Sequence, residues 1–144
     1  MRFSVLILCL FVLGCSSRQS VEDAKAVVKS HEEFVKTGNL DGVVGNMTDD
    51  VVGIIPGMPL IKGKDAFRIY YAGTFKSGKT EMTHDIRGAE AEGDVVILHG
   101  FAQGTLTFPD TTMVPLSENF LMLFKKQEDG TMKMWRVAFS PGAR

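Results

Sequence analysis

Three histidines are the side chains in this sequence best suited to acid–base chemistry, and each falls among apolar residues. His31 interrupts an apolar helical stripe, while His84 and His99 alternate with apolar residues in two expected strands. Imidazole titrates near neutral pH and is the commonest metal ligand in proteins. No two histidines have the spacing His-x-His or His-x-x-x-His. We therefore expect no metal site and no cofactor.

Other polar residues on apolar faces extend this set. Glu118 shares a strand face with Phe120, either as a pocket carboxylate with a raised pKa or as a strand-end charge in water. Tyr70 offers a phenol donor or packs in the core. Each histidine likewise has a structural alternative, as a buried side chain with satisfied hydrogen bonds. The candidate ligand-pocket residues are His31, Tyr70, His84, His99, Glu118 and Trp135.

The elements that position these side chains follow from hydrophobic periodicity. Apolar residues recur at helical spacing after Ser20, a residue suited to capping, and the pattern ends at Gly38. The third expected helix is apolar on most sides, which predicts that it is largely buried. We expect helices over 21–37, 41–47 and 64–75, and strands over 51–55, 59–61, 80–91, 94–107, 117–127 and 132–140. Three helices followed by an antiparallel meander define an α+β fold.

Two turn signals, Gly93-Asp94 and Asp129-Gly130, set the register of the meander. In regular ladders the first gives the pairs Ile86–Phe101, His84–Gln103 and Gly88–His99, and the second gives Phe124–Trp135, Met122–Val137 and Phe120–Phe139. The first register separates the rings of His84 and His99 by roughly 13 Å along the strand. The loop over 108–116 does not fix the register of the strand that follows it. The sequence therefore leaves open whether the residues that alternate with His99 and those that alternate with Trp135 lie on the same face of the sheet.

The N-terminal segment has the features of a targeting signal. Arg2 precedes an apolar run over 3–13, which is too short to span a membrane as a helix. This order is typical of a secretory signal, and residues 12–15, which end in Cys15, resemble the bacterial lipobox. A plain secretory signal with a chance cysteine is the alternative. We expect a signal peptide over 1–14, a lipidated Cys15 and tether over 15–20, and a domain over 21–144 held at the bacterial cell envelope by its lipid.

Composition and context exclude two classes of partner. The chain has 144 residues, with 16 Lys and Arg against 17 Asp and Glu, so no basic surplus favours nucleic acid. Residues 73–80 fit the spacing of a phosphate-binding loop. That loop lies between a strand and a following helix, whereas here a helical pattern precedes and a strand follows. We expect neither nucleic acid nor ATP as a partner.

Three segments together, over residues 34–52, 59–68 and 119–137, resemble the SnoaL-like, ketosteroid-isomerase-like group of the nuclear transport factor 2-like superfamily. The resemblance implies a cone-shaped roll in which three N-terminal helices close a curved antiparallel sheet around one deep pocket. Members include isomerases, dehydratases, epoxide hydrolases, cyclases and many domains without known activity, and we expect a branch of unknown function. Many members carry a polar or acidic residue where Phe139-Ser140-Pro141 stands here.

Two functional classes follow from these residues. The first is a membrane-anchored module that binds a small apolar molecule or dimerises, and the missing acid–base pair favours it. The alternative is an enzyme of the isomerase, dehydratase or hydrolase type that acts on a small apolar carbonyl compound by general acid–base catalysis. Both faces of the sheet are largely apolar, and helices cover only one of them. A homodimer formed through the other face is therefore expected.

Overall fold

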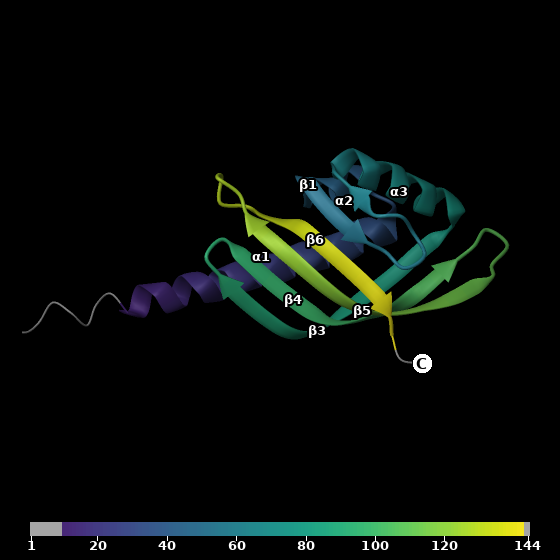
Figure 1. The fold of residues 1–144 in the computed structure, drawn as a ribbon. Helices are drawn as coiled ribbons and strands as arrows, with labels where there is room; N and C mark the ends of the chain where they lie inside the picture. The colour runs from purple at the N-terminus through teal and green to yellow at the C-terminus, as the bar shows by residue number, and fades with distance from the viewer. Residues whose placement is uncertain (1–9, 143–144) are drawn as a thin grey trace, which may run out of the picture.

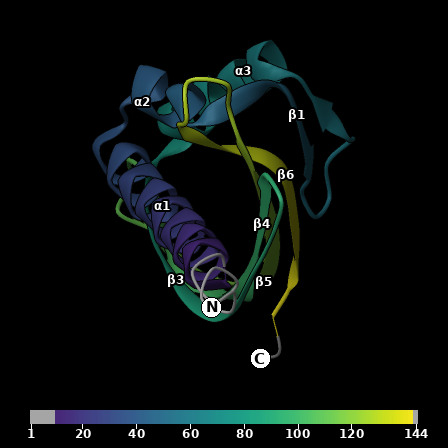
Figure 2. The ribbon, with the colours of Figure 1, turned by 90° about the vertical axis from the view of Figure 1, so that its left-hand side faces the viewer.

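The protein is an α+β roll in which helices close one side of a strongly curved sheet (Figures 1 and 2). The computed structural model describes residues 10–142, with side chains from residue 17 onward. Residues 1–9 of the expected signal peptide and the side chain of Cys15 lie outside the described part. The elements are α1 (Leu10–Thr37), α2 (Leu40–Gly45), β1 (Met47–Ile54), β2 (Ile61–Lys62), α3 (Lys64–Ser77), β3 (Lys79–Glu92), β4 (Val95–Thr107), β5 (Met113–Lys126) and β6 (Met132–Pro141).

The strands form one six-stranded sheet in the order β2-β1-β6-β5-β4-β3. All neighbours are antiparallel except β1 and β6, which run parallel. The expected α+β class, with three helices on a curved, mostly antiparallel sheet, is confirmed. The helix that precedes the phosphate-loop-like residues and the strand that follows them are also observed, since Gly73 lies in α3 and Lys79 begins β3.

Helix α1 is longer than the sequence pattern predicts. It includes the expected residues 21–37 but begins at Leu10. Residues 17–20, which we expected in a tether, are helical, and Ser20 is buried. No helix among the described residues is both long enough and apolar enough to span a membrane.

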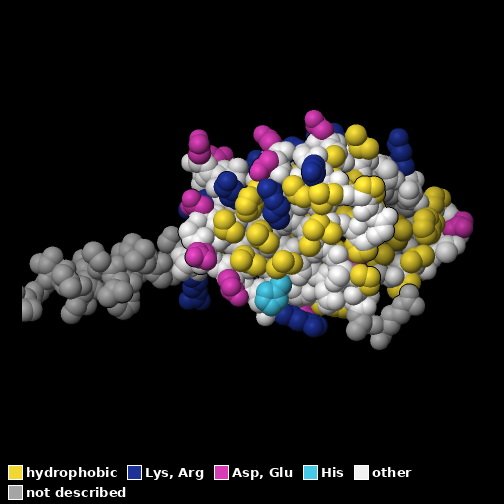
Figure 3. Space-filling model, viewed as in Figure 1, with side chains coloured by type: hydrophobic (Ala, Val, Ile, Leu, Met, Phe, Trp, Pro, Cys, Tyr) yellow, Lys and Arg dark blue, Asp and Glu magenta, His cyan; other side chains and the backbone are white. Residues whose placement is uncertain are grey.

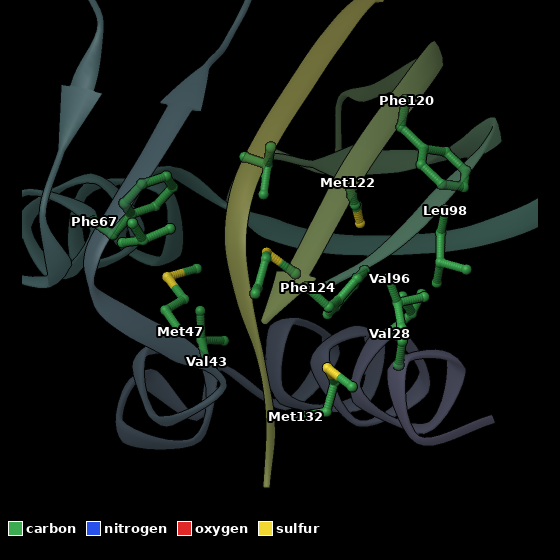
Figure 4. Packing of buried hydrophobic residues seen from close by; sticks show 14 of the residues in the cluster. Val28, Val43, Met47, Phe67, Val96, Leu98, Phe120, Met122, Phe124 and Met132 are labelled. Atoms are coloured by element: carbon green, nitrogen blue, oxygen red, sulfur yellow. The ribbon is translucent and has the colours of Figure 1, made fainter. Parts of the chain in front are cut away.

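The core lies between α1 and the face of the sheet that curves around it, here called the inner face (Figures 2 and 4). Val28 of α1 packs in the same buried cluster as Leu98, Met122 and Phe124 of the inner face. The expectation for α3 was wrong: it is not largely buried. Phe67 is its one buried residue, and Ile69 is 76% exposed. Helix α3 contacts the sheet only near its edge, so much of its apolar surface stays open.

Two β-bulges change the register that the turns predict. Arg87 is an extra residue in β3, because Ile86 pairs with Gly100 while Gly88 pairs with His99. Trp135 is extra in β6, because Leu123 pairs with Arg136 while Phe124 pairs with Met134. The expected pairs Gly88–His99, Met122–Val137 and Phe120–Phe139 are confirmed, whereas Ile86–Phe101, His84–Gln103 and Phe124–Trp135 are wrong by one residue.

A one-residue shift exchanges the two faces of a strand. The bulge at Arg87 therefore separates two histidines that a regular ladder would place on one face. His84 pairs with buried Ala102 and faces inward, and its side chain is 4% exposed. His99 lies on the opposite face, here called the outer face, and is exposed.

Candidate functional site

A cavity of about 670 Å³ lies between α1, α3 and the inner face of the sheet. Most of its lining is apolar, with aromatic rings from α3 and from the ends of β4 and β6. The few polar side chains come from α1, α3 and the strands β3 and β5. They are His31, Glu32, Tyr70, Tyr71, Thr74, Ser77, Thr80, His84 and Glu118. An apolar cavity with a few convergent polar groups is the usual form of a small-molecule site.

His84 is held in the cavity by Glu32 of α1. One carboxylate oxygen of Glu32, Oε1, lies 2.9 Å from Nδ1 of His84 and accepts the backbone N–H of His84 at 2.6 Å. An ionised carboxylate can only accept, so the neutral imidazole carries its proton on Nδ1 and a lone pair on Nε2. Nε2 is buried and has no partner among the described residues. Glu32 thus fixes both the orientation and the tautomer of a potential base.

His31 and Tyr71 form a second, neutral pair in the lining of the cavity. Nε2 of His31 lies 2.9 Å from the Tyr71 hydroxyl, and the two rings meet edge to face. Burial, followed by the charge of His84, lowers the pKa of His31 to about 4. Burial is also the main reason that the pKa of Tyr71 is raised. Both rings are uncharged at neutral pH, so they shape the cavity without adding charge.

Glu118 lies on the same row of the sheet as His84. Ala102 pairs with His84 on one side and with Glu118 on the other. Since neighbouring strands are about 4.8 Å apart, the two backbones are roughly 10 Å apart. Glu118 is half-buried, and burial raises the pKa of its carboxyl. Ala102 between them is fully buried in the core, while both polar side chains line the cavity.

The structure brings four of the six candidate residues together and excludes two. His31, Tyr70, His84 and Glu118 all line the cavity. His99 lies outside it, on the outer face above Gly88. Trp135 also lies outside the cavity. It is the extra residue of the bulge in β6, so it does not continue the alternation of residues that point to the inner face. Its indole N–H donates to Asp50 at 2.9 Å, and the Arg136 guanidinium stands 4.0 Å from its ring centroid.

Sequence reasoning missed Glu32, the residue that gives His84 its orientation. Glu32 follows His31 directly and lies at the margin of the apolar stripe of α1, where a charged residue is normally solvated. Its contact with β3 joins residues 52 positions apart. A half-exposed glutamate in a helix has no local pattern that distinguishes it from its solvated neighbours. Among the described residues, no group of three or more His, Cys, Asp or Glu side chains is placed to hold a metal ion.

The curved roll and its apolar cavity define a class of cone-shaped α+β domains, and comparison with known proteins gives the family. The model of the SnoaL-like domain family matches residues 27–136. The chain therefore belongs to the SnoaL-like domain family. None of the curated proteins matches this sequence.

Solved structures of the same fold are similar over most of this chain. A ketosteroid isomerase-like protein from Erwinia carotovora atroseptica has a TM-score of 0.77 at 21% identity, over 86% of this chain and 97% of its own. A nuclear transport factor 2-like superfamily protein from Salmonella enterica serovar Typhimurium has a TM-score of 0.78 at 11% identity, over 88% and 94%. A putative aromatic ring hydroxylase from Novosphingobium aromaticivorans has a TM-score of 0.77 at 16% identity, over 88% and 91%. At these identities the likeness concerns the fold.

Proposed function

We propose that the protein binds a small, mainly apolar molecule in the cavity, with a polar group of the ligand directed at His84. The observation that supports this is the buried Nε2 of His84, which has no partner among the described residues. A buried acceptor without a hydrogen bond costs free energy. A ligand hydroxyl, enol or amine that donates to Nε2 removes this cost, while its apolar body covers the aliphatic and aromatic lining.

A second candidate function is proton transfer, and the contact between Glu32 and His84 favours it. A carboxylate that fixes the imidazole tautomer and stabilises the imidazolium makes histidine an effective general base. The ketosteroid isomerase-like relative has the same fold. On this proposal His84 removes a proton next to a carbonyl group of the bound ligand, and Glu32 holds the protonated ring in place.

One experiment separates binding from catalysis. Nile red, a neutral dye that brightens in apolar sites, reports occupancy. Two ligands compete with it for the cavity: 2-naphthol, whose hydroxyl can donate to Nε2, and 2-tetralone, an apolar ketone. We expect His84→Phe to weaken 2-naphthol binding about threefold to tenfold, the value of one hydrogen bond. The matched variant His99→Phe changes a histidine on the outer face and should leave affinity unchanged. Equal effects of the two substitutions would contradict the proposed site.

The same samples test catalysis through the exchange of the α-hydrogens of 2-tetralone with deuterated solvent, followed by NMR. A general base contributes about 10²–10⁴-fold, so His84→Phe should reduce exchange to the buffer rate. Glu32→Gln should slow exchange at least about tenfold with the dissociation constant within about twofold. If the wild-type protein binds 2-tetralone without accelerating exchange, the binding module is the better description.

We also propose that two copies pair through the outer face of the sheet. Leu121 is 44% exposed there, and Ile97, Phe101 and Leu123 lie beside it on the same face. Figure 3 shows apolar side chains gathered across this face, with charged groups toward one end. Sedimentation should show a dimer at micromolar concentration that Leu121→Glu dissociates, whereas Leu60→Glu, at an exposed leucine elsewhere, should not. A wild-type monomer would contradict the proposal.

For location, we propose that a lipid on Cys15 holds the domain at the bacterial cell envelope after residues 1–14 are removed. The support is the apolar run over 3–13 and the small residue before the cysteine. Mass spectrometry of the protein from membranes should find Cys15 as its modified first residue, and Cys15→Ser should release the chain from the membrane fraction. A mature N-terminus elsewhere would contradict the anchor.

A further inference from the structure

The charges that line the cavity have one sign. Its lining contains two carboxylates, Glu32 and Glu118, and neither lysine nor arginine. Glu32 already accepts hydrogen bonds from the backbone N–H and the ring Nδ1–H of His84, which stabilise its charge. His31 is neutral, because its pKa lies near 4. The charge of Glu118 is therefore the one that this cavity leaves without a counterpart.

The carboxylate of Glu118 has neither a hydrogen-bond donor nor a cation as a partner among the described residues, and burial is what raises its pKa. Its two cross-strand neighbours, Ala102 and Pro141, have no polar side chain that could donate to it. A carboxylate that is partly removed from water without a donor or a cation is costly. Two events relieve the cost, namely uptake of a proton or arrival of a positive charge.

The side chains around Glu118 suit a cation better than they suit a neutral group. Tyr70 is close enough for the charge of Glu118 to raise its pKa, after the larger effect of burial. Phe139 pairs with Phe120, two residues from Glu118 on the same inner face, and also lines the cavity. The faces of aromatic rings attract ammonium groups, most strongly where water is excluded. The carboxylate and the rings together form a site of negative potential inside an apolar cavity.

We propose that the natural ligand carries a positive charge, as a protonated amine or a quaternary ammonium group on a compact apolar body, and that Glu118 pairs with this charge. The proposal rests on the proposed function, because it uses the same cavity. The apolar body of such a ligand extends from Glu118 along the apolar lining of the cavity toward His84. Ligands with a carboxylate or phosphate are rejected, since Glu118 would repel them and no lysine or arginine in the lining would pair with them.

Three probes with the same phenylbutyl body test the charge directly: 4-phenylbutylamine, 4-phenylbutanol and 5-phenylpentanoate, titrated calorimetrically at pH 7. We expect the amine to bind at least about tenfold more tightly than the alcohol, as for a partly buried charge pair, and the carboxylate to show no binding. Glu118→Gln should bring the amine to within about twofold of the alcohol. Glu90→Gln, which removes one exposed carboxylate of β3 outside the cavity, is the control and should change neither affinity.

The outcomes separate this inference from the proposed function. If Nile red and the alcohol bind but the amine has no advantage, the inference is overturned and the cavity function stands. If the amine keeps its advantage in Glu118→Gln, the inference is also overturned, because the charge is recognised elsewhere. If neither Nile red nor any probe binds, both fail. Should Glu118→Gln not fold, the ranking of the three probes on the wild-type protein still decides.

Discussion

We expect the free energy of unfolding to fall by about 3 kcal/mol between pH 7 and pH 4, with His31 as the cause. The pKa of His31 is lowered from 6.5 to about 4 in the folded protein, chiefly by burial. Between these two values the unfolded chain binds a proton at this ring and the folded protein does not. Stability is therefore present above pH 6.5 and is lost as the pH falls toward 4.

Chemical denaturation of His31→Leu at several pH values isolates this contribution. The variant should show a much flatter dependence between pH 7 and pH 4, while His99→Leu, at an exposed ring, should keep the wild-type slope. The pKa values of Asp49, Asp50, Asp110 and Asp129 are lowered in the folded protein, so the stability that they contribute is lost mainly below pH 4. The raised pKa of Glu118 acts in the opposite direction, because the folded state takes up that proton more readily.

An unchanged slope in His31→Leu would show that another group controls acid unfolding. The same variant also tests the role of the ring at pH 7. It loses the hydrogen bond to Tyr71, a cost of about 1 kcal/mol, and gains an apolar side chain in a buried place. We expect a stability close to that of the wild type. Weaker ligand binding by a folded variant would then assign His31 to the cavity.

The helices and strands of this fold can be predicted from the sequence because the signals for them are local. The apolar stripe with Val28 and Val35 predicts α1, and both residues are buried. Gly93 ends the β3–β4 ladder in a tight turn with a positive φ, as its sequence context indicates. The candidate site can be predicted only in part, because its geometry depends on contacts between segments that are distant in the sequence. His84 and Glu118 could be named as candidates, but their common row across Ala102 required the correct register.

The bulges are the reason that this register could not be read from the sequence. Neither Arg87 nor Trp135 is a residue type that marks a bulge, and each is preceded and followed by regular pairing. Counting outward from a turn assumes one residue on each strand per step. In β3 the count from the turn is right up to the bulge and wrong by one beyond it. In β6 the opposite holds, because the turn does not have the assumed length: the count is wrong by one before the bulge, and the bulge restores it. His99 lies before the bulge at Arg87 and His84 beyond it, so the two rings are assigned to one face although they occupy opposite faces.

The register beyond the bulge places His84 on the inner face, and deletion of Arg87 tests whether the extra residue itself is needed for this. The deletion brings the pairs Ile86–Gly100 and Gly88–His99 next to each other and makes the β3–β4 ladder regular. Residues 79–86 keep their partners in β4, so Met82, His84 and Ile86 still point inward. Because no apolar side chain is exposed and no charge is buried, we expect a folded protein that still binds Nile red.

The matched control is Arg87→Ala, which keeps the extra residue. The side chain of Arg87 is 62% exposed and pairs with Asp85 at the surface, so this substitution should change stability by less than about 1 kcal/mol. Thermal melts and Nile red binding follow both variants. A deletion variant that unfolds or loses the dye, beside a folded Arg87→Ala variant, would contradict this expectation and show that the local twist of the bulge is itself required. A deletion variant that melts near the wild type and binds the dye would show that the inward position of His84 is imposed by the hydrophobic alternation of β3 and by Glu32.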